Sequence, residues 1–134
     1  MAKLTTDEFI QAAEFRSALR SFQRLAERAA RRAGLTPQRY LLLLMIRGAP
    51  DGSGSSTVTE LAERLQLAQS TVTELVGRAE EAGLIEREAS QVDARVAHLS
   101  LTREGERRLS RIVEELSTER HDLSDAFGKL GQPV

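Results

Sequence analysis

The stretch from Asp93 to Gly105, which reads DARVAHLSLTREG, constrains the fold more than any other part of the chain. Apolar residues alternate with polar ones from Ala97 to Leu101, which is the period of a half-buried strand. At Thr102 the apolar spacing changes to three and four residues, so the strand ends and a helix begins there. Leu84 to Ala89 is a second candidate strand, and a turn from Ser90 to Ala94 joins the two strands into a hairpin.

Two short amphipathic helices are predicted just before the hairpin, over residues 57–67 and 68–84. Two helices of this length around a short turn, here Gln66 to Gln69, are typical of a helix–turn–helix. The early residues of the second helix are small or polar and lie off its apolar face: Gln69, Ser70, Thr71, Thr73 and Glu74. This composition suits a recognition helix that meets base edges in the major groove, but an ordinary amphipathic helix explains it equally well.

The hairpin favours the first of these two interpretations. A helix–turn–helix followed directly by two strands is a winged helix, and its turn carries Arg95 at a protruding tip. A guanidinium at such a tip can enter a narrow minor groove. Asp93 can hold this arginine or brace the turn; the alternative is an isolated surface ion pair of little energetic value. The pattern therefore predicts a DNA-binding protein.

The net charge of −1 hides an uneven distribution of charge. Residues 1–48 hold nine Lys and Arg against four Asp and Glu, a balance of +5, whereas residues 57–103 hold five Arg against eight acidic residues, a balance of −3. The predicted DNA-binding lobe must therefore bind through a few focused arginines and helix ends. Arg64, Arg78 and Arg87 are candidates for phosphate contacts, which set the register without reading sequence.

Two further helices are predicted before this lobe. Residues 7–33 contain neither Pro nor Gly, and Thr6 or Asp7 is available as the N-terminal cap. Thr36 and Pro37 then start an almost wholly apolar helix that ends at Gly48 and should be the buried central helix. Residues 49–56, APDGSGSS, are predicted to be a plain flexible connector.

The apolar stripe from Leu109 to Leu130 keeps helical spacing for more than five turns at 3.6 residues per turn. One small winged domain cannot cover such a stripe, so part of it should pack, together with the first helix, on a second copy of the chain. We therefore predict a single domain over residues 1–134, mainly α with a small β-hairpin wing. Residues 7–33 and 105–130 are the expected dimerisation helices, and residues 57–103 form the DNA-binding lobe.

The composition argues against several other classes of protein. The chain has no Cys, and its two histidines, His98 and His121, have no second His or Cys near them in the sequence. Because no nucleophile, phosphate or metal motif is present, we predict neither an enzyme nor a cofactor or metal site. The longest apolar run is too short to cross a membrane, and the first residues lack the apolar core of a secretory signal, so a cytoplasmic protein is expected.

These motifs resemble those of the multiple antibiotic resistance regulator (MarR) family of bacterial transcription factors. The family's wing signature is matched at every spacing by six residues, which are Asp93, Arg95, Leu99, Leu101, Thr102 and Gly105. The preceding residues STVTELVGRAEEAGLIER look like the family's recognition helix and first wing strand, with Gly83 and Arg87 in register. The resemblance covers nearly the whole chain, including the predicted dimerisation helices.

The resemblance implies a homodimeric repressor on a pseudo-palindromic operator. Residues 69–74 of each subunit would enter successive major grooves, about 34 Å apart, and each Arg95 a flanking minor groove. It further implies a small aromatic or phenolic effector between the dimerisation helices and the DNA-binding lobe. Such an effector would lower DNA affinity by favouring a dimer whose recognition helices are wrongly spaced. The candidates for lining its site are Phe15, Phe22, Arg39 and Tyr40.

Two residues depart from the family pattern. Glu74 occupies a position where many relatives have a base- or phosphate-contacting Arg, and Ala68 stands where a capping Ser or Thr is common. Glu74 either accepts a hydrogen bond from a cytosine amino group or points away from the DNA. The acidic balance of residues 57–103 keeps an alternative function open, in which the winged helix acts through protein partners or binds DNA without any effector.

Overall fold

The computed structural model describes residues 3–130, so the two ends of the predicted domain, residues 1–2 and 131–134, lie outside the described part. Within it the chain forms six helices and one three-stranded sheet. In chain order these elements are α1 (Thr6–Arg32), α2 (Pro37–Arg47), β1 (Ser55–Ser56), α3 (Val58–Leu65), α4 (Gln69–Glu81), β2 (Ile85–Ala89), β3 (Ala97–Leu101), α5 (Arg103–Glu115) and α6 (Ser117–Leu130). The predicted mainly helical fold with a β-hairpin wing is confirmed.

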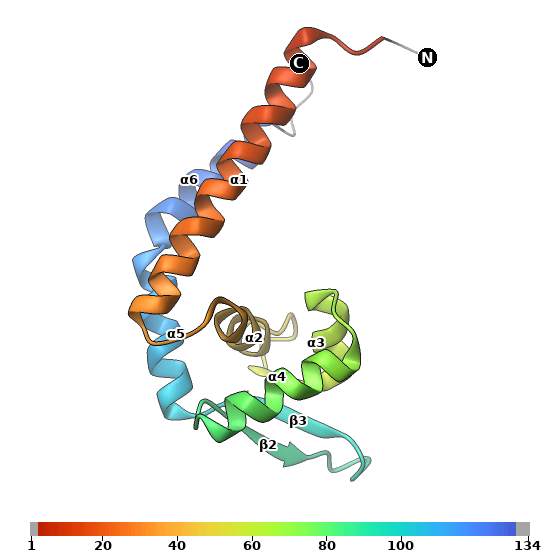
Figure 1. Ribbon diagram of the computed structural model, residues 1–134. Coiled ribbons are helices and arrows are strands. Elements are labelled where there is room, and N and C mark those ends of the chain that lie inside the picture. Colours follow the sequence, from red (N-terminus) through yellow and green to blue (C-terminus); the bar gives the residue numbers. More distant parts are fainter. Residues whose placement is uncertain (1–2, 131–134) are drawn as a thin grey trace.

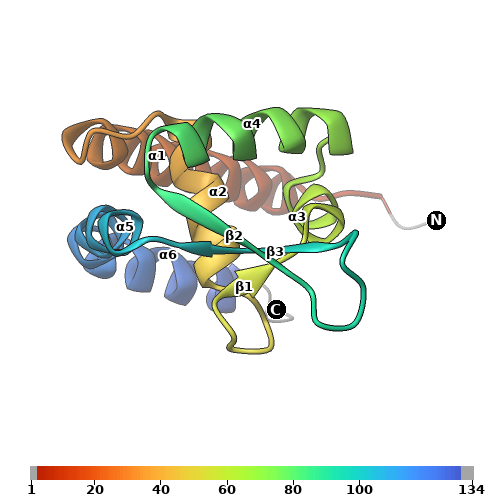
Figure 2. The same ribbon diagram turned by 90° about the horizontal axis from the view of Figure 1, so that it is seen from below.

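The elements divide into a lobe and a projecting pair of helices (Figure 1). The lobe contains α2, α3, α4 and the sheet, whereas α1 and α6 lie side by side and extend away from it. Seen from below, α4 and the hairpin of β2 and β3 lie near the viewer, on the side of the lobe away from that pair (Figure 2). No described helix combines the length and the apolar character that a bilayer crossing requires.

The helices begin where side chains can cap them. The Thr36 hydroxyl accepts a hydrogen bond from the main-chain N–H of Arg39 at 3.2 Å, and Pro37 follows as the first helical residue. The cap of α1 is Thr5, so the expected Thr6 or Asp7 was wrong. The reason is a capping box, in which Thr5 and Glu8 each accept a hydrogen bond from the other's main-chain N–H.

The hydrophobic core surrounds α2, as predicted. Leu42, Leu43 and Ile46 are completely buried in this helix. They pack against apolar side chains from the rest of the lobe and from α1 and α5, among them Ala29, Leu61, Val72, Val76, Leu84, Leu99 and Ile112. Each buried Leu or Ile contributes roughly 1.5–3 kcal/mol by leaving water, so α2 is the element on which the other helices are positioned.

The sheet is antiparallel with strand order β1–β3–β2. β2 and β3 form the predicted hairpin, in which Ile85 faces Leu101 and Ala89 faces Ala97. The short β1 was not predicted, because residues 49–56 were expected to be a plain connector. Two serines carry no apolar period, and β1 exists only through its pairing with β3, which buries Ser56 to 2% exposure.

The C-terminal apolar stripe is interrupted, although its spacing predicted uninterrupted helical packing from Leu109 to Leu130. The structure has two helices that meet at Leu116, whose side chain is only 3% exposed. This residue packs into the core, and α6 then follows α1. The side chain of Arg120 donates to the carbonyl of Val113 at 3.0 Å, so it satisfies an acceptor near the end of α5.

Candidate nucleic-acid interface

The predicted helix–turn–helix is formed by α3, α4 and the residues 66–68 between them. Gln66 ends α3 in the left-handed conformation, with φ of 56°, and its main-chain N–H donates to carbonyls of the last turn. Ala68 then precedes α4 and makes no side-chain hydrogen bond to the helix, because its methyl group has no acceptor atom. The first N–H groups of α4 therefore lack a side-chain cap and can meet an anionic oxygen.

The two faces of α4 have different compositions. Its inner face buries Val72, Leu75, Val76 and Ala79 against the core. The five predicted DNA-contacting residues, Gln69, Ser70, Thr71, Thr73 and Glu74, are all exposed. The amide of Gln69 lies 3.4 Å from the hydroxyl of Thr59 on α3, so this side chain is turned toward the preceding helix. The helical period thus separates the two faces as the sequence predicted.

Glu74 forms an ion pair one turn along α4 with Arg78. Nη2 of Arg78 lies 2.6 Å from Oε1 of Glu74, and the two side chains are 60% and 63% exposed. An exposed pair at i,i+4 spacing contributes only about 0.3–0.5 kcal/mol. Water or a nucleic acid can therefore replace this contact at little cost, and both groups are accessible on the outer surface of α4.

Arg64 and Arg87 already bind other parts of the protein. The guanidinium of Arg64 donates to the carbonyl of Met45 at 2.7 Å and to that of Gly48 at 3.3 Å, at the end of α2. Nε of Arg87 lies 3.1 Å from the Glu80 carboxylate, and this hydrogen bond raises the pKa of Arg87. Both arginines therefore hold the lobe together, and their contact with phosphates stays a prediction.

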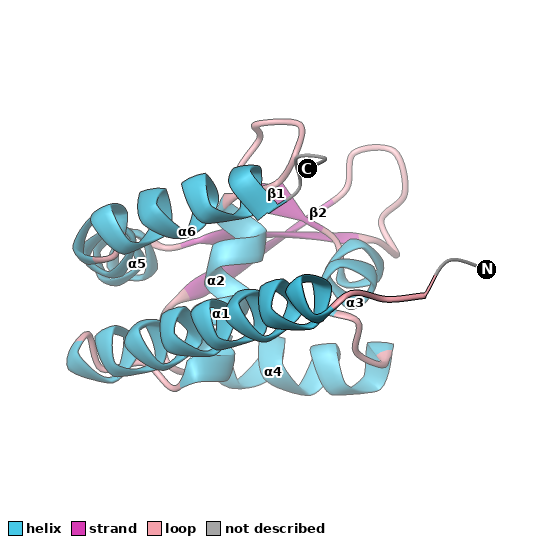
Figure 3. Ribbon diagram, turned by 90° about the horizontal axis from the view of Figure 1, so that it is seen from above, coloured by secondary structure: helices cyan, strands magenta, loops and turns pink. Residues whose placement is uncertain are grey.

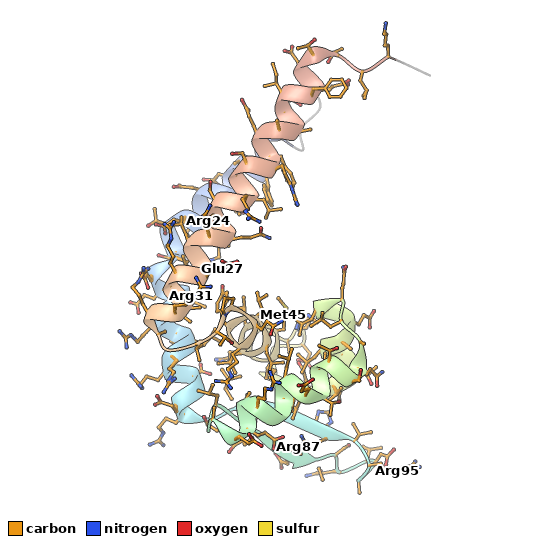
Figure 4. The ribbon with its side chains drawn as sticks, in the orientation of Figure 1. Arg24, Glu27, Arg31, Met45, Arg87 and Arg95 are labelled. Atoms are coloured by element: carbon orange, nitrogen blue, oxygen red, sulfur yellow. The ribbon has the colours of Figure 1, made fainter. Side chains whose placement is uncertain are left out.

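The wing places Arg95 at its tip, as Figure 4 shows. Its side chain is 91% exposed, and Oδ1 of Asp93 accepts hydrogen bonds from its main-chain N–H at 3.0 Å and from Nε at 3.2 Å. These hydrogen bonds hold the pKa of the Asp93 carboxyl below its ordinary value. The Ser90 hydroxyl accepts from the N–H groups of Val92 and Asp93, so the turn is braced from both sides.

A cavity of about 500 Å³ lies between the helix pair and the lobe. Its walls come from α1, α2, α5 and α6, and its lining residues are Phe22, Tyr40, Leu44, Val113, Leu116, Arg120, Leu123, Ser124 and Phe127. Phe22 and Tyr40 had been predicted for an effector site, and Phe15 stacks on Phe127 with 4.5 Å between ring centroids. Arg39 is not among the lining residues of this cavity.

Arg120 supplies the positive charge of this cavity, and it was not among the residues predicted for an effector site. Burial raises the pKa of Tyr40, and the nearby charge of Arg120 partly offsets that effect. The cavity therefore combines an apolar wall with one guanidinium and one phenol. No local sequence motif identifies Arg120, which lies in α6 just after the break between the two C-terminal helices at Leu116.

The match to known families agrees with this geometry. Residues 33–96 match the model of the MarR family. The chain is 39% identical over 75 residues to the HTH-type transcriptional regulator YsmB of Bacillus subtilis (strain 168), and 35% identical over 80 residues to the HTH-type transcriptional repressor MdtR of the same organism. These alignments cover 55% and 60% of this chain and 49% of each relative, so the chain spans about half the length of both.

A solved structure extends the similarity beyond the lobe. The crystal structure of the MarR family transcription regulator SP03579 superposes with a TM-score of 0.72 at 26% identity. The superposition covers 90% of this chain and 78% of that one. The shared fold therefore includes the projecting helices as well as the helix–turn–helix and the wing.

Proposed function

Because this chain belongs to the MarR family, we propose that it is a DNA-binding transcriptional regulator that acts as a homodimer and represses its target genes. One observation carries the proposal. The helix α4, with its exposed polar face, and the braced, 91% exposed Arg95 lie at the same end of the molecule, opposite the projecting helices (Figure 4). A recognition helix and a wing arginine need this common orientation to bind one DNA duplex.

In the proposed complex, α4 enters the major groove and Arg95 enters the adjacent minor groove. Ser70, Thr73 and Glu74 then face base edges, and Glu74 accepts a hydrogen bond from a cytosine amino group. Arg78 and the uncapped start of α4 contact phosphates. Few cations take part, since the lobe is acidic in balance, and we therefore expect a modest dependence of affinity on salt.

The projecting helices support a dimer. In the N-terminal half of α1, Phe9 is 63% exposed and Ile10 is 49% exposed. This half of α1 extends away from the lobe (Figure 1), and α1 and α6 run side by side when seen from above (Figure 3). Burial of such apolar side chains against a second copy of the chain would stabilise a dimer. A two-fold dimer would present two copies of α4 to two half-sites of a pseudo-palindromic operator.

The cavity supports control by a small aromatic acid. Its volume of about 500 Å³ lies in the range of ligand sites, which is roughly 300–1,000 Å³. Phe22 and Tyr40 offer aromatic surface, and Arg120 offers a partner for a carboxylate. Because α2 belongs to the lobe and α6 to the projecting pair, a ligand between them biases the angle at which the two α4 helices are held.

A second candidate is a winged helix that acts through a protein partner or binds DNA without an effector. The observation that favours it is the acidic outer surface of the lobe, where Glu74, Glu81, Glu86 and Glu88 are exposed. These carboxylates repel phosphates. A basic protein partner would meet no such repulsion.

Selection from a random duplex library separates sequence-specific DNA binding from action through a protein partner. The full chain is incubated with the library, bound duplexes are amplified over several rounds, and the selected duplex is titrated against a scrambled one at two salt concentrations. We expect an inverted repeat bound by two chains, with much weaker binding of the scrambled duplex. Recovery of no shared sequence would contradict sequence-specific DNA binding and favour the protein-partner candidate.

A further inference from the structure

Gly77 is the one glycine in α4, the proposed recognition helix, and it lies well inside the helix. Glycine in a helix interior is destabilising relative to alanine, because it loses more conformational freedom on folding. A glycine at such a position usually has a local reason, either an unusual backbone conformation or a neighbour that leaves no room for a side chain. Neither reason applies to Gly77.

The backbone at Gly77 is ordinary helix. Its φ is not positive, unlike that of Gly83 in the turn after α4, which has φ of 74°. A methyl group added to Gly77 would meet no neighbouring atom within 4 Å, apart from the helix's own backbone. By contrast, a methyl group on Gly105 would lie 2.1 Å from the carbonyl oxygen of Leu84, so that glycine is required by packing. The fold of the single chain therefore does not require Gly77.

Gly77 lies on the outward side of α4. Ser70, Glu74, Gly77 and Glu81 follow one another at steps of four, three and four residues, which keeps them on one helical face. That face is opposite the side that buries Val72, Val76 and Ala79. Figure 2 shows α4 along one edge of the lobe, with no other described element outside it. Gly77 itself is half-buried, and the outward face of α4 carries no side chain at this position.

We propose that Gly77 is a close-approach position, where the base edges at the floor of the major groove contact the main chain of α4. The inference rests on the proposed DNA binding and specifies how the helix is seated. An α-helix with its side chains is about 10–12 Å wide and the major groove is about 12 Å wide, so little space is left. A missing side chain in the middle of the outward face lets α4 lie deeper.

Deeper seating also brings the neighbouring cation into reach of the DNA. Arg78 follows Gly77 and lies beside the outward face, with 60% of its side chain exposed. Its contact with Glu74 is an exposed pair that a phosphate can replace. When α4 lies deep in the groove, Arg78 meets the phosphates of the groove wall while Glu74 stays near the bases. The close approach at Gly77 thus gives both of its charged neighbours, Glu74 and Arg78, a partner on the DNA.

The experiment compares Gly77→Ala and Gly77→Leu with a matched control, Gly128→Ala in α6, where an added methyl group also meets no neighbouring atom within 4 Å. The duplex recovered by library selection is titrated against each full-length variant, and thermal unfolding is followed by circular dichroism. We expect Gly77→Ala and Gly128→Ala both to raise the melting temperature. The Gly77 variants should nevertheless lose affinity for the duplex, by about tenfold for Ala and by more for Leu.

The possible failures are distinguishable. Wild-type affinity for the duplex in both Gly77 variants overturns the inference and leaves the proposed function standing. A lower melting temperature of Gly77→Ala overturns it as well, because the site would then not be open. If the wild-type chain binds no selected duplex, the proposed function falls and the inference falls with it.

Discussion

The hydroxyl of Thr102 donates a hydrogen bond to the main-chain oxygen of Gly83 across 2.6 Å. The same hydroxyl accepts from the N–H of Gly105 at 3.1 Å, and the N–H of Thr102 donates to the carbonyl of Leu84 at 3.0 Å. One residue therefore joins the turn after α4 to the first turn of α5.

Replacement of Thr102 by Val removes the N-terminal cap of α5 and the hydrogen bond to Gly83 while keeping the shape of the side chain. Loss of a cap of this kind costs about 1–2 kcal/mol. We expect the free energy of unfolding, measured by urea titration, to fall by about that amount. Thr102→Ser is the matched control, because it keeps the hydroxyl. Equal stability of the Val variant and the wild-type chain would show that these hydrogen bonds contribute nothing.

Gly105→Ala should be strongly destabilising. The methyl group would lie 2.1 Å from the carbonyl oxygen of Leu84, and that oxygen is held by the N–H of Thr102. Forced overpacking of this kind costs typically 1–3 kcal/mol, and a backbone neighbour cannot rotate away. The melting temperature of the variant, compared with that of Gly128→Ala, checks this expectation. An unchanged value would mean that α5 can shift away from β2 without cost.

Much of the fold follows from local signals in the sequence. The predicted hairpin strands agree with β2 and β3 to within one residue, because alternation marks a half-buried strand and polar residues mark its turn. The start of α2 agrees because Thr36 and Pro37 suit only the first positions of a helix. Signals of this kind depend on a few neighbouring residues, so they can be read without knowledge of tertiary contacts.

Features that depend on distant contacts could not be predicted. β1 exists because Ser55 and Ser56 pair with β3, more than 40 residues later in the chain. The break at Leu116 is set by the packing of its side chain in the core, whereas the spacing of apolar residues continues past it. Both features result from interactions that sequence periodicity does not record.

Only part of the candidate DNA-binding surface could be predicted from the sequence. The helical period of α4 identified its exposed face, and the spacing of the wing turn placed Asp93 beside Arg95. The contacts of Arg64 with the end of α2 and of Arg87 with Glu80 were not predicted, since they depend on how the helices pack. The same holds for Arg120, which lines the cavity from α6, after the break at Leu116.

Arg95→Ala should weaken binding of the selected duplex without changing the oligomeric state. The guanidinium is 91% exposed, so its removal leaves the fold intact, but the proposed minor-groove contact is lost. We expect an affinity lower by roughly tenfold to a hundredfold, and a smaller dependence on salt, by about one counterion. Fluorescence anisotropy at several salt concentrations measures both effects.

The control for the wing arginine is Arg111→Ala on α5, which removes the same charge from an exposed position away from the wing. It should leave the affinity nearly unchanged. A similar loss in both variants would mean that Arg95 acts only through net charge, and an unchanged affinity in Arg95→Ala would rule out a role for the wing tip.

Glu104 should make stability depend on pH in the acidic range. Hydrogen bonds from Arg107, and then from Arg108, lower the pKa of its carboxyl from 4.5 to about 2. A group whose pKa is lower in the folded state stabilises the fold above its unfolded pKa, and this contribution disappears as the pH falls toward about 2. The wild-type chain should therefore be more stable than Glu104→Gln at pH 7, and the difference should vanish between pH 4.5 and 2.

Denaturant titrations at several pH values test this expectation. Glu114→Gln serves as the control, because Glu114 is an exposed carboxylate of the same helix that forms no ion pair among the described residues. Its stability difference from the wild-type chain should stay nearly constant over this range. A constant difference for Glu104→Gln too would show that its contacts with the two arginines are fully screened by solvent.

Arg120 should decide whether the cavity accepts an acid. If the guanidinium binds the carboxylate of an aromatic ligand, benzoate raises the melting temperature of the wild-type chain more than its neutral analogue benzamide does. In Arg120→Met the apolar wall is kept and the cation is lost, so the preference for benzoate should disappear. Arg120→Lys keeps a cation at this position and should recover part of the preference. Since Arg120 also donates to the carbonyl of Val113, each shift is measured against the same variant without ligand. An equal preference for benzoate in the Met variant and the wild-type chain would exclude Arg120 as the partner of the carboxylate.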